Sequence, residues 1–297
     1  MPDGRRFLKP EALKKLANMN LVARLVVEGF ISGLHRSPYK GFSVEFSQHR
    51  AYSPGDDLKH LDWKVYARSD KYYIKQYEEE TNLKAYILLD SSNSMSYQSN
   101  GVSKFEYGCY LAASLAYLMI RQQDSVGLVV FDEEIKEHVP PKSTATHLKV
   151  ILGHLEGIKV GKQTNLSKTF HDLAERVRRR GLIIVISDLL ADPAEVLRGL
   201  KHFRHRKHEV IVFHLLDHEE LTFPFTRMTV FRDLETNERL SVDPNSIRRE
   251  YLQSMQQFLK GYKQGCYESN IDYLSVDTSV PFDLCLTSYL AKRQKVR

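Results

Sequence analysis

The sequence predicts an α/β fold in which helices cover both faces of a doubly wound, mostly parallel β-sheet. The first observation is a set of four short apolar runs rich in β-branched residues, which is the composition of strands buried on both faces of a sheet. Each run ends in an aspartate or lies just before one: LKAYILLD, SVGLVVFD, GLIIVISDLL and HEVIVFHLLD. The second observation is that segments with helical periodicity alternate with these runs, which favours parallel strands joined by crossover helices.

The expected helices of this region span residues 104–123, 146–158, 166–180 and 193–205. Four arginines crowd the end of the third helix, where cations complement the helix dipole, and Gly181 is expected to end it. Pro193 suits the first turn of the fourth helix. The run 133–141 follows the second strand too closely for a crossover helix, so we expect an antiparallel edge hairpin closed by Pro140 and Pro141.

The chain on either side of this pattern has a different character. Residues 1–82 contain one expected helix, over residues 10–27, and then β-like alternation in GFSVEF and KYYIKQYEEE. We therefore predict an N-terminal lobe with a helix and a small β-sheet, and an α/β domain over residues 83–297. After Asp217 that domain is expected to add a hairpin at MTVFRDLETNERLSV, a helix over 244–266, a strand over 271–276 and a terminal helix.

Composition and charge narrow the class of protein. Lys and Arg total 43 against 37 Asp and Glu, so the formal charge of +6 is a mild excess that does not predict nucleic-acid binding. The cysteines Cys109, Cys266 and Cys285 are far apart and indicate neither a disulfide framework nor a zinc site. The N-terminus lacks the apolar segment of a secretory signal, and no apolar run reaches the ~20 residues needed to cross a bilayer. We expect a cytoplasmic protein without a membrane span.

A group of oxygen ligands follows the first apolar run. The sequence LLDSSNSMS places Asp90, Ser92 and Ser94 at alternate positions in the loop after that strand, where open parallel sheets bind their ligands. A carboxylate and two hydroxyls suit a small hard cation such as Mg2+, which typically keeps several of its waters. The alternative interpretation is a plain strand-to-helix turn, because Asp and Ser often cap helices and form turns.

The DxSxS pattern resembles the metal-ion-dependent adhesion site of von Willebrand factor A domains, whose sheet is of the Rossmann type. The resemblance implies that two further loops complete the site, and it assigns Thr164 in GKQTN and Asp188 in ISD to them. Lys162 and Gln163 stand in place of the second glycine of the family's GGTN loop, so this loop departs from the family pattern just before Thr164. The resemblance implies one divalent ion, Mg2+ or else Mn2+ or Ca2+, bound directly by the hydroxyls and largely through water by the aspartates. A partner's Glu or Asp would fill the open position.

A second resemblance covers the region before the first strand. The segment from His35 to Glu80 is similar to a bacterial family catalogued as domain of unknown function fifty-eight, on these residues: Ser43, Glu45, Arg50, Tyr52, Gly55, Asp56, Asp57, Asp62, Trp63, Ala67 and Arg68. Members are encoded next to MoxR-type AAA+ ATPases, and the resemblance implies work with them in assembling, activating or inserting cofactors into other proteins. From the residues themselves, we expect Trp63 to anchor the lobe and its charged side chains to form ion pairs or a partner-facing surface.

These patterns together predict a protein-interaction module that is not an enzyme. Its metal site would capture an acidic residue of a MoxR-type AAA+ ATPase or of a client, through Asp90, Ser92, Ser94, Thr164 and Asp188. The alternative is a metal-dependent hydrolase or phosphotransferase that uses the ion as a Lewis acid, with Asp132 or His214 as its base. No Walker, GxSxG or GxGxxG motif occurs. A cluster with His202, His205 and His208 is interpreted as a solvated helix end.

Overall fold

The computed structural model describes residues 44–53, 61–79, 84–99, 101–121, 123–161, 166–177 and 179–280. Contacts divide the chain into two compact units, one within residues 27–82 and one that holds the large sheet, and each is described by itself. The expected boundary at residues 82 and 83 lies outside the described residues. So do the helix expected over residues 10–27 and the expected C-terminal helix.

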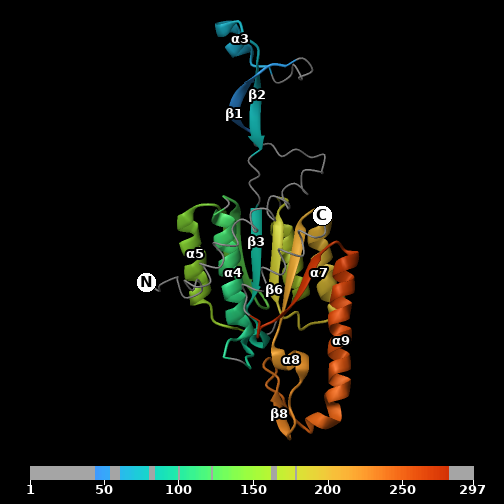
Figure 1. Ribbon diagram of the computed structural model, residues 1–297. Helices are drawn as coiled ribbons and strands as arrows, with labels where there is room; N and C mark the ends of the chain where they lie inside the picture. Colours follow the sequence, from blue (N-terminus) through green and yellow to red (C-terminus); the bar gives the residue numbers. More distant parts are fainter. Residues whose placement is uncertain are drawn as a thin grey trace. The chain divides into compact units, whose positions relative to one another are not determined.

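The larger unit is built on a six-stranded sheet with the order β10-β7-β6-β3-β4-β5 (Figure 1). The strands are β3 (Lys84–Asp90), β4 (Ser125–Phe131), β5 (Ile135–Lys142), β6 (Leu182–Ser187), β7 (Glu209–Leu216) and β10 (Asp272–Asp277). All neighbouring pairs are parallel except β4 and β5. The four apolar runs are β3, β4, β6 and β7, and nearly all their residues are buried because helices cover both faces. The prediction of a doubly wound, mostly parallel sheet is confirmed.

The two faces of the sheet have different helical partners. The helices are α4 (Lys104–Arg121), α5 (Ala145–Gly157), α6 (Leu166–Arg176), α7 (Pro193–His205) and α9 (Pro244–Glu268). Alternate residues of a strand point to opposite faces. Leu89 thus meets α4 at Gly108, whereas Leu88 belongs to a core cluster with Phe170 of α6 and Phe203 of α7.

Helix α6 is shorter than the sequence pattern predicts. It ends at Arg176 rather than at residue 180, because Val177 turns into the core and the chain must then reach β6. Gly181 does not end this helix, so that expectation is wrong. Its position beside β3 explains the glycine instead, since a Cβ there would overlap the backbone carbonyl oxygen of Lys84.

The predicted edge hairpin is confirmed as the antiparallel pair of β4 and β5. Pro140 and Pro141 lie within β5 itself, which is possible because an edge strand has one side without ladder hydrogen bonds. The pairing register shifts beside Gly127, where a Cβ would lie 2.8 Å from the carbonyl oxygen of Val139. This glycine therefore allows the two backbones to approach closely.

The segment between β7 and β10 adds three smaller elements. Asp217 begins α8 (His218–Thr222) with a capping box, in which it accepts a backbone hydrogen bond and Glu220 accepts one in return. Strands β8 (Thr229–Arg232) and β9 (Arg239–Val242) then form the predicted antiparallel hairpin. In Figure 1, α8 and this hairpin extend from the end of the sheet at which the parallel strands finish.

The smaller unit pairs β1 (Val44–Ala51) with β2 (Tyr73–Glu79) in an antiparallel ribbon, beside α3 (Trp63–Ser69). The expectation that Trp63 anchors this lobe is wrong, because its side chain is 63% exposed. Among the lobe residues whose side chains the structure describes, the buried apolar ones are Leu61 and Ile74, which are joined by an isolated β-bridge. Asp62 accepts a hydrogen bond from the Val65 backbone in the first turn of α3. Residues 54–60, which include Asp56 and Asp57, lie outside the described residues.

Candidate metal centre

Each parallel strand of the sheet is followed or ended by an aspartate at the same edge. Asp90 ends β3 and Asp277 ends β10, while Asp132, Asp188 and Asp217 come directly after β4, β6 and β7. Because these strands are parallel, their carboxyl ends lie together, and this edge is where open α/β sheets bind ligands. The predicted site residues Asp90 and Asp188 are therefore brought to neighbouring strand ends.

The DxSxS loop is folded into a compact, buried arrangement. Asp90 Oδ1 accepts a 2.9 Å hydrogen bond from the Ser92 backbone, and its Oδ2 accepts a 2.6 Å bond from the Ser187 hydroxyl. The hydroxyl oxygens of Ser92 and Ser94 lie 3.0 Å apart. Asp90 and Ser92 have no exposed surface, and Ser94 is 8% exposed.

The short 3-10 helix η2 (Asn93–Ser96) begins within this loop, so a plain strand-to-helix turn would use Ser92 as its helix cap. Ser92 stands at its N-cap but makes no side-chain capping bond. The turn is instead held by the Asp90 carboxylate, which accepts the Ser92 backbone N–H. The two serine hydroxyls are thus directed to each other and remain available as oxygen ligands.

Asp188 is held by a buried lysine that the sequence analysis did not single out. Lys104, the first residue of α4, has no exposed surface, and its Nζ lies 2.8 Å from Asp188 Oδ2 and 2.7 Å from Glu220 Oε1. Burial alone lowers the pKa of Lys104, but the two carboxylates outweigh it and raise that pKa. The available signal was a lysine at the first position of a mostly apolar helix.

The carboxylates at this edge outnumber the positive charge that contacts them. Burial, and then the negative charge of Asp188, raise the pKa of Asp90 to about 7, although hydrogen bonds from Ser187 and Ser92 oppose the shift. Burial and the charge of Asp188 also raise the pKa of Glu235 in the β8–β9 turn. Such an excess of negative groups favours a bound cation.

Both residues named as possible bases are already engaged. Asp132 Oδ2 lies 2.6 Å from the ammonium of Lys136, and its Oδ1 accepts a backbone hydrogen bond. His214 donates through Nε2 to the backbone carbonyl of Asp188 at 2.7 Å, so its Nδ1 accepts from the Tyr273 hydroxyl, also at 2.7 Å. Burial lowers the pKa of His214 to about 4. This ring is therefore a neutral structural group that positions the Asp188 loop.

The fifth predicted ligand, Thr164, lies outside the described residues, which stop at Gly161 and resume at Leu166. Gly161 itself donates a 2.8 Å backbone hydrogen bond to Ser91, so the preceding part of that loop is attached to the DxSxS loop. A Cβ at Gly161 would meet the side-chain ends of the Asp132–Lys136 ion pair, so this ion pair lies directly against the loop. The assignment of Thr164 stays a prediction.

The sheet order, the helices on both faces and the loop at the end of β3 define an α/β protein with a doubly wound, mostly parallel sheet. The chain belongs to the family described as "Protein of unknown function DUF58", whose sequence profile matches residues 48–258. The predicted family is thus confirmed. Among the described residues, no helix combines the length and apolar character that crossing a membrane requires.

Three related sequences and two solved structures are similar to this chain. The uncharacterized proteins Rv1480 of Mycobacterium tuberculosis and Mb1516 of Mycobacterium bovis are each 25% identical over 240 residues, which covers 79% of this chain and 75% of theirs. The uncharacterized protein YeaD of Bacillus subtilis is 28% identical over 106 residues, covering 36% of this chain and 24% of its own. The conserved hypothetical protein BatB from Bacteroides thetaiotaomicron matches with 23% identity and a TM-score of 0.47, covering 72% of this chain and 99% of that one. The SpRpn10 VWA domain matches with 15% identity and a TM-score of 0.31, covering 46% and 76%.

Proposed function

We propose that this protein is a divalent-metal-dependent protein-interaction module rather than an enzyme, with Mg2+ as its ion and Mn2+ or Ca2+ as alternatives. The observation that carries the proposal is the 3.0 Å separation of the buried Ser92 and Ser94 hydroxyl oxygens beside Asp90. Adjacent ligands of an octahedral ion with metal–oxygen bonds of about 2.1 Å lie about 3.0 Å apart. The two hydroxyls therefore fit neighbouring positions around Mg2+.

Each residue has a distinct role in this proposal. Ser92 and Ser94 bind the ion directly, while Asp90 and Asp188 act through water and Thr164 completes the set. Lys104 supports the indirect role of Asp188, because the ammonium already occupies one of its carboxylate oxygens. The bound ion would supply an electrophilic position for an incoming carboxylate, which exchanges its hydration for a charge-assisted bond.

The proposed partner is a protein that presents a Glu or Asp side chain, namely a MoxR-type AAA+ ATPase or a client of it. The acidic character of the partner follows from a site with few directly coordinating negative groups. The choice of a MoxR-type ATPase rests on the resemblance to the family, within which residues 48–258 match. The protein would then help such an ATPase to assemble or activate other proteins.

The metal site is tested by calorimetric titration of Mg2+ into the full chain and three serine variants. Ser92→Ala and Ser94→Ala are expected to weaken binding by tenfold or more, because each removes a direct ligand. Ser96→Ala is the matched control, since Ser96 lies in the same short helix but is exposed and bonds the Asn93 carbonyl. Equal Mg2+ affinities for all four proteins would show that the serines do not bind the ion.

The interaction is tested by affinity capture from the native cell, with Mg2+ and with a chelator. The expected result is a MoxR-type ATPase or a client that is retained with Mg2+ and lost with the chelator or with Asp90→Ala. A partner that binds equally in every condition would contradict metal-dependent capture. Folding of Asp90→Ala is checked by circular dichroism, so that a loss of binding is not mistaken for unfolding.

A further inference from the structure

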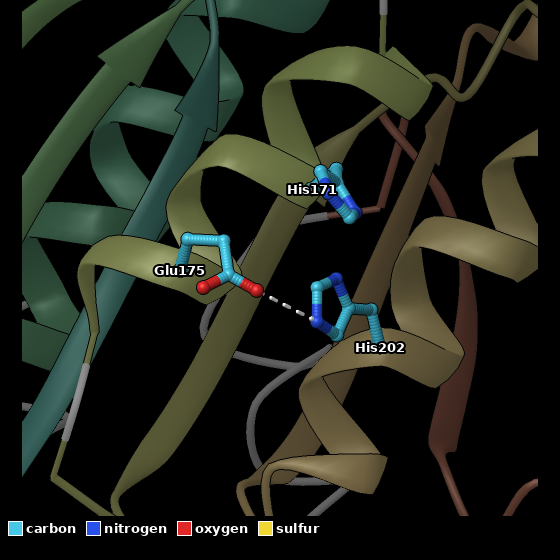
Figure 2. Close-up of side chains that lie close together, drawn as sticks. All are labelled: His171, Glu175 and His202. Atoms are coloured by element: carbon cyan, nitrogen blue, oxygen red, sulfur yellow. Dashed lines mark ion pairs between the residues drawn. The ribbon is translucent and has the colours of Figure 1, made fainter.

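A second group of metal-binding side chains lies between α6 and α7, outside the DxSxS site. His171 and Glu175 are four residues apart on α6, so they share one face of that helix, and His202 of α7 faces them (Figure 2). Each of the three offers one ligand atom, and these atoms lie within 4.8 Å of one another. We propose that His171, Glu175 and His202 form a binding site for a transition-metal ion of the Zn2+ class.

The donor set selects this class of ion. Two imidazoles and a carboxylate suit Zn2+, Ni2+ and Cu2+, whereas Mg2+ prefers oxygen ligands alone. Three protein ligands leave at least one coordination position to water. The imidazole rings of His171 and His202 already stand with centroids 4.5 Å apart, so small side-chain rotations would bring both onto one ion.

The surroundings of His202 point to a missing ligand. Its Nε2 lies 3.3 Å from Glu175 Oε1, while its Nδ1 is buried and has no hydrogen-bond partner among the described residues. In Figure 2 the ring edge turned away from Glu175 faces His171. A buried imidazole nitrogen without a partner is unusual in a folded protein, and a bound ion is one explanation of it.

The charges around the group set its affinity. Arg206 pairs with Glu175 Oε2, which leaves Oε1 directed toward His202 and resembles the outer partners that orient ligating carboxylates. Arg206 also repels an incoming cation, so the affinity is moderate.

The histidines grouped together in the sequence have separate roles in the structure. His208 is buried, and its ring nitrogens are engaged by Gly181 and by the Val177 carbonyl, so the solvated helix end was the wrong interpretation for it. His205 is exposed on the same helix as His202 and is not part of the three-residue group. It therefore provides a matched control for the metal site.

The proposal is tested by competition between the full chain and a chromogenic chelator for Zn2+. The wild type is expected to bind one Zn2+ that His171→Ala or His202→Ala weakens by tenfold or more, and His205→Ala should bind like the wild type. Glu175→Gln should weaken binding as well, because the amide lacks the carboxylate charge. The same affinity in the wild type, His171→Ala and His202→Ala would overturn the proposal.

Two further measurements keep this result independent of the DxSxS site. Mg2+ titrations of His171→Ala and His202→Ala should match the wild type, whereas Ser94→Ala should keep its Zn2+ affinity. Zn2+ should also raise the melting temperature of the wild type more than that of His202→Ala, since an ion there joins α6 to α7. Equal shifts in melting temperature would again contradict the site. Circular dichroism of each variant without metal checks that it folds.

Discussion

The ammonium group of Lys104 lies fully buried between the carboxylates of Asp188 and Glu220. A buried ion pair contributes little net stability, but the loss of one member leaves the other charges uncompensated. At this position the lysine fixes Asp188 beside the DxSxS loop without a metal. Lys104 is thus one of the residues that fix the position of Asp188.

We predict that Lys104→Met lowers the free energy of unfolding by about 3 kcal/mol in the presence of a chelator, because two carboxylates lose their buried counterion. Saturating Mg2+ should recover part of this loss. Denaturant unfolding measures both effects. Lys201→Met, on the exposed surface of α7, is the control and should stay within about 0.5 kcal/mol of the wild type. A Lys104→Met protein as stable as this control would contradict the role of the ion pair.

The buried His214 should make the free energy of unfolding depend on pH. Burial lowers its pKa to about 4 in the folded state, whereas an unfolded histidine titrates near pH 6.5. As the pH falls through this window the unfolded state takes up the proton first, so stability is lost, by about 3 kcal/mol in total. Above pH 6.5 the contribution is fully present.

The measurement is the free energy of unfolding between pH 4 and pH 7, for the wild type and His214→Gln. Glutamine keeps a donor and an acceptor but does not titrate, so the variant should gain less stability than the wild type as the pH rises from 4 to 7. Both proteins share a background from other buried groups, because burial lowers the pKa of His208 but raises the pKa of Asp90 and of Asp124 to about 7, which acts in the opposite direction. Parallel curves for the two proteins would show that His214 is not the titrating group.

At the scale of elements, α4 is positioned by a glycine one turn after Lys104. A Cβ at Gly108 would lie 2.9 Å from Leu89, 3.3 Å from Ile186 and 3.4 Å from Leu215, which belong to three adjacent strands. The absent side chain lets the helix approach the sheet directly behind the site. The close packing of α4 against the sheet therefore places Lys104, at the start of this helix, beside the strand ends.

We predict that Gly108→Val lowers the free energy of unfolding by about 1–3 kcal/mol, because the added methyl groups overpack the helix–sheet contact. Gly153→Val in α5 is the control, since nothing lies within 4 Å of a Cβ there. That substitution should be neutral or slightly stabilising, because valine has the higher helix propensity. Thermal and denaturant unfolding compare the two. A neutral Gly108→Val would show that the sheet yields at this contact.

At the scale of the whole molecule, the proposed Mg2+ would stabilise the folded chain by mass action. At a concentration 100 times the dissociation constant, the stabilisation is about 2.7 kcal/mol. We predict a rise in melting temperature of about 5–10 °C over the chelator-treated protein for a unit of this size. Scanning calorimetry measures the shift. A Ser92→Ala and Ser94→Ala double variant should lose most of it, and an equal shift in that variant would attribute the effect to ionic strength.

Much of this molecule was predictable from local sequence. The strands were recognisable because residues buried on both faces must all be apolar, as in LIIVIS of β6. The crossover helices followed from their periodicity, and the DxSxS loop from its place after the first strand. The end of α6 was misjudged because the inward turn of Val177 depends on packing rather than on helix propensity. The exposure of Trp63 was missed for the same reason.

The sequence by itself determined the family, the strand and helix order and the place of the DxSxS loop, because these are encoded in short stretches of chain. The tertiary structure alone decided which distant groups meet. Ser187 reaches Asp90, Lys104 reaches Asp188, and His202 reaches α6 only when the sheet and helices are packed together. Contacts between residues far apart along the chain are set by the whole fold, since no local pattern records which elements become neighbours.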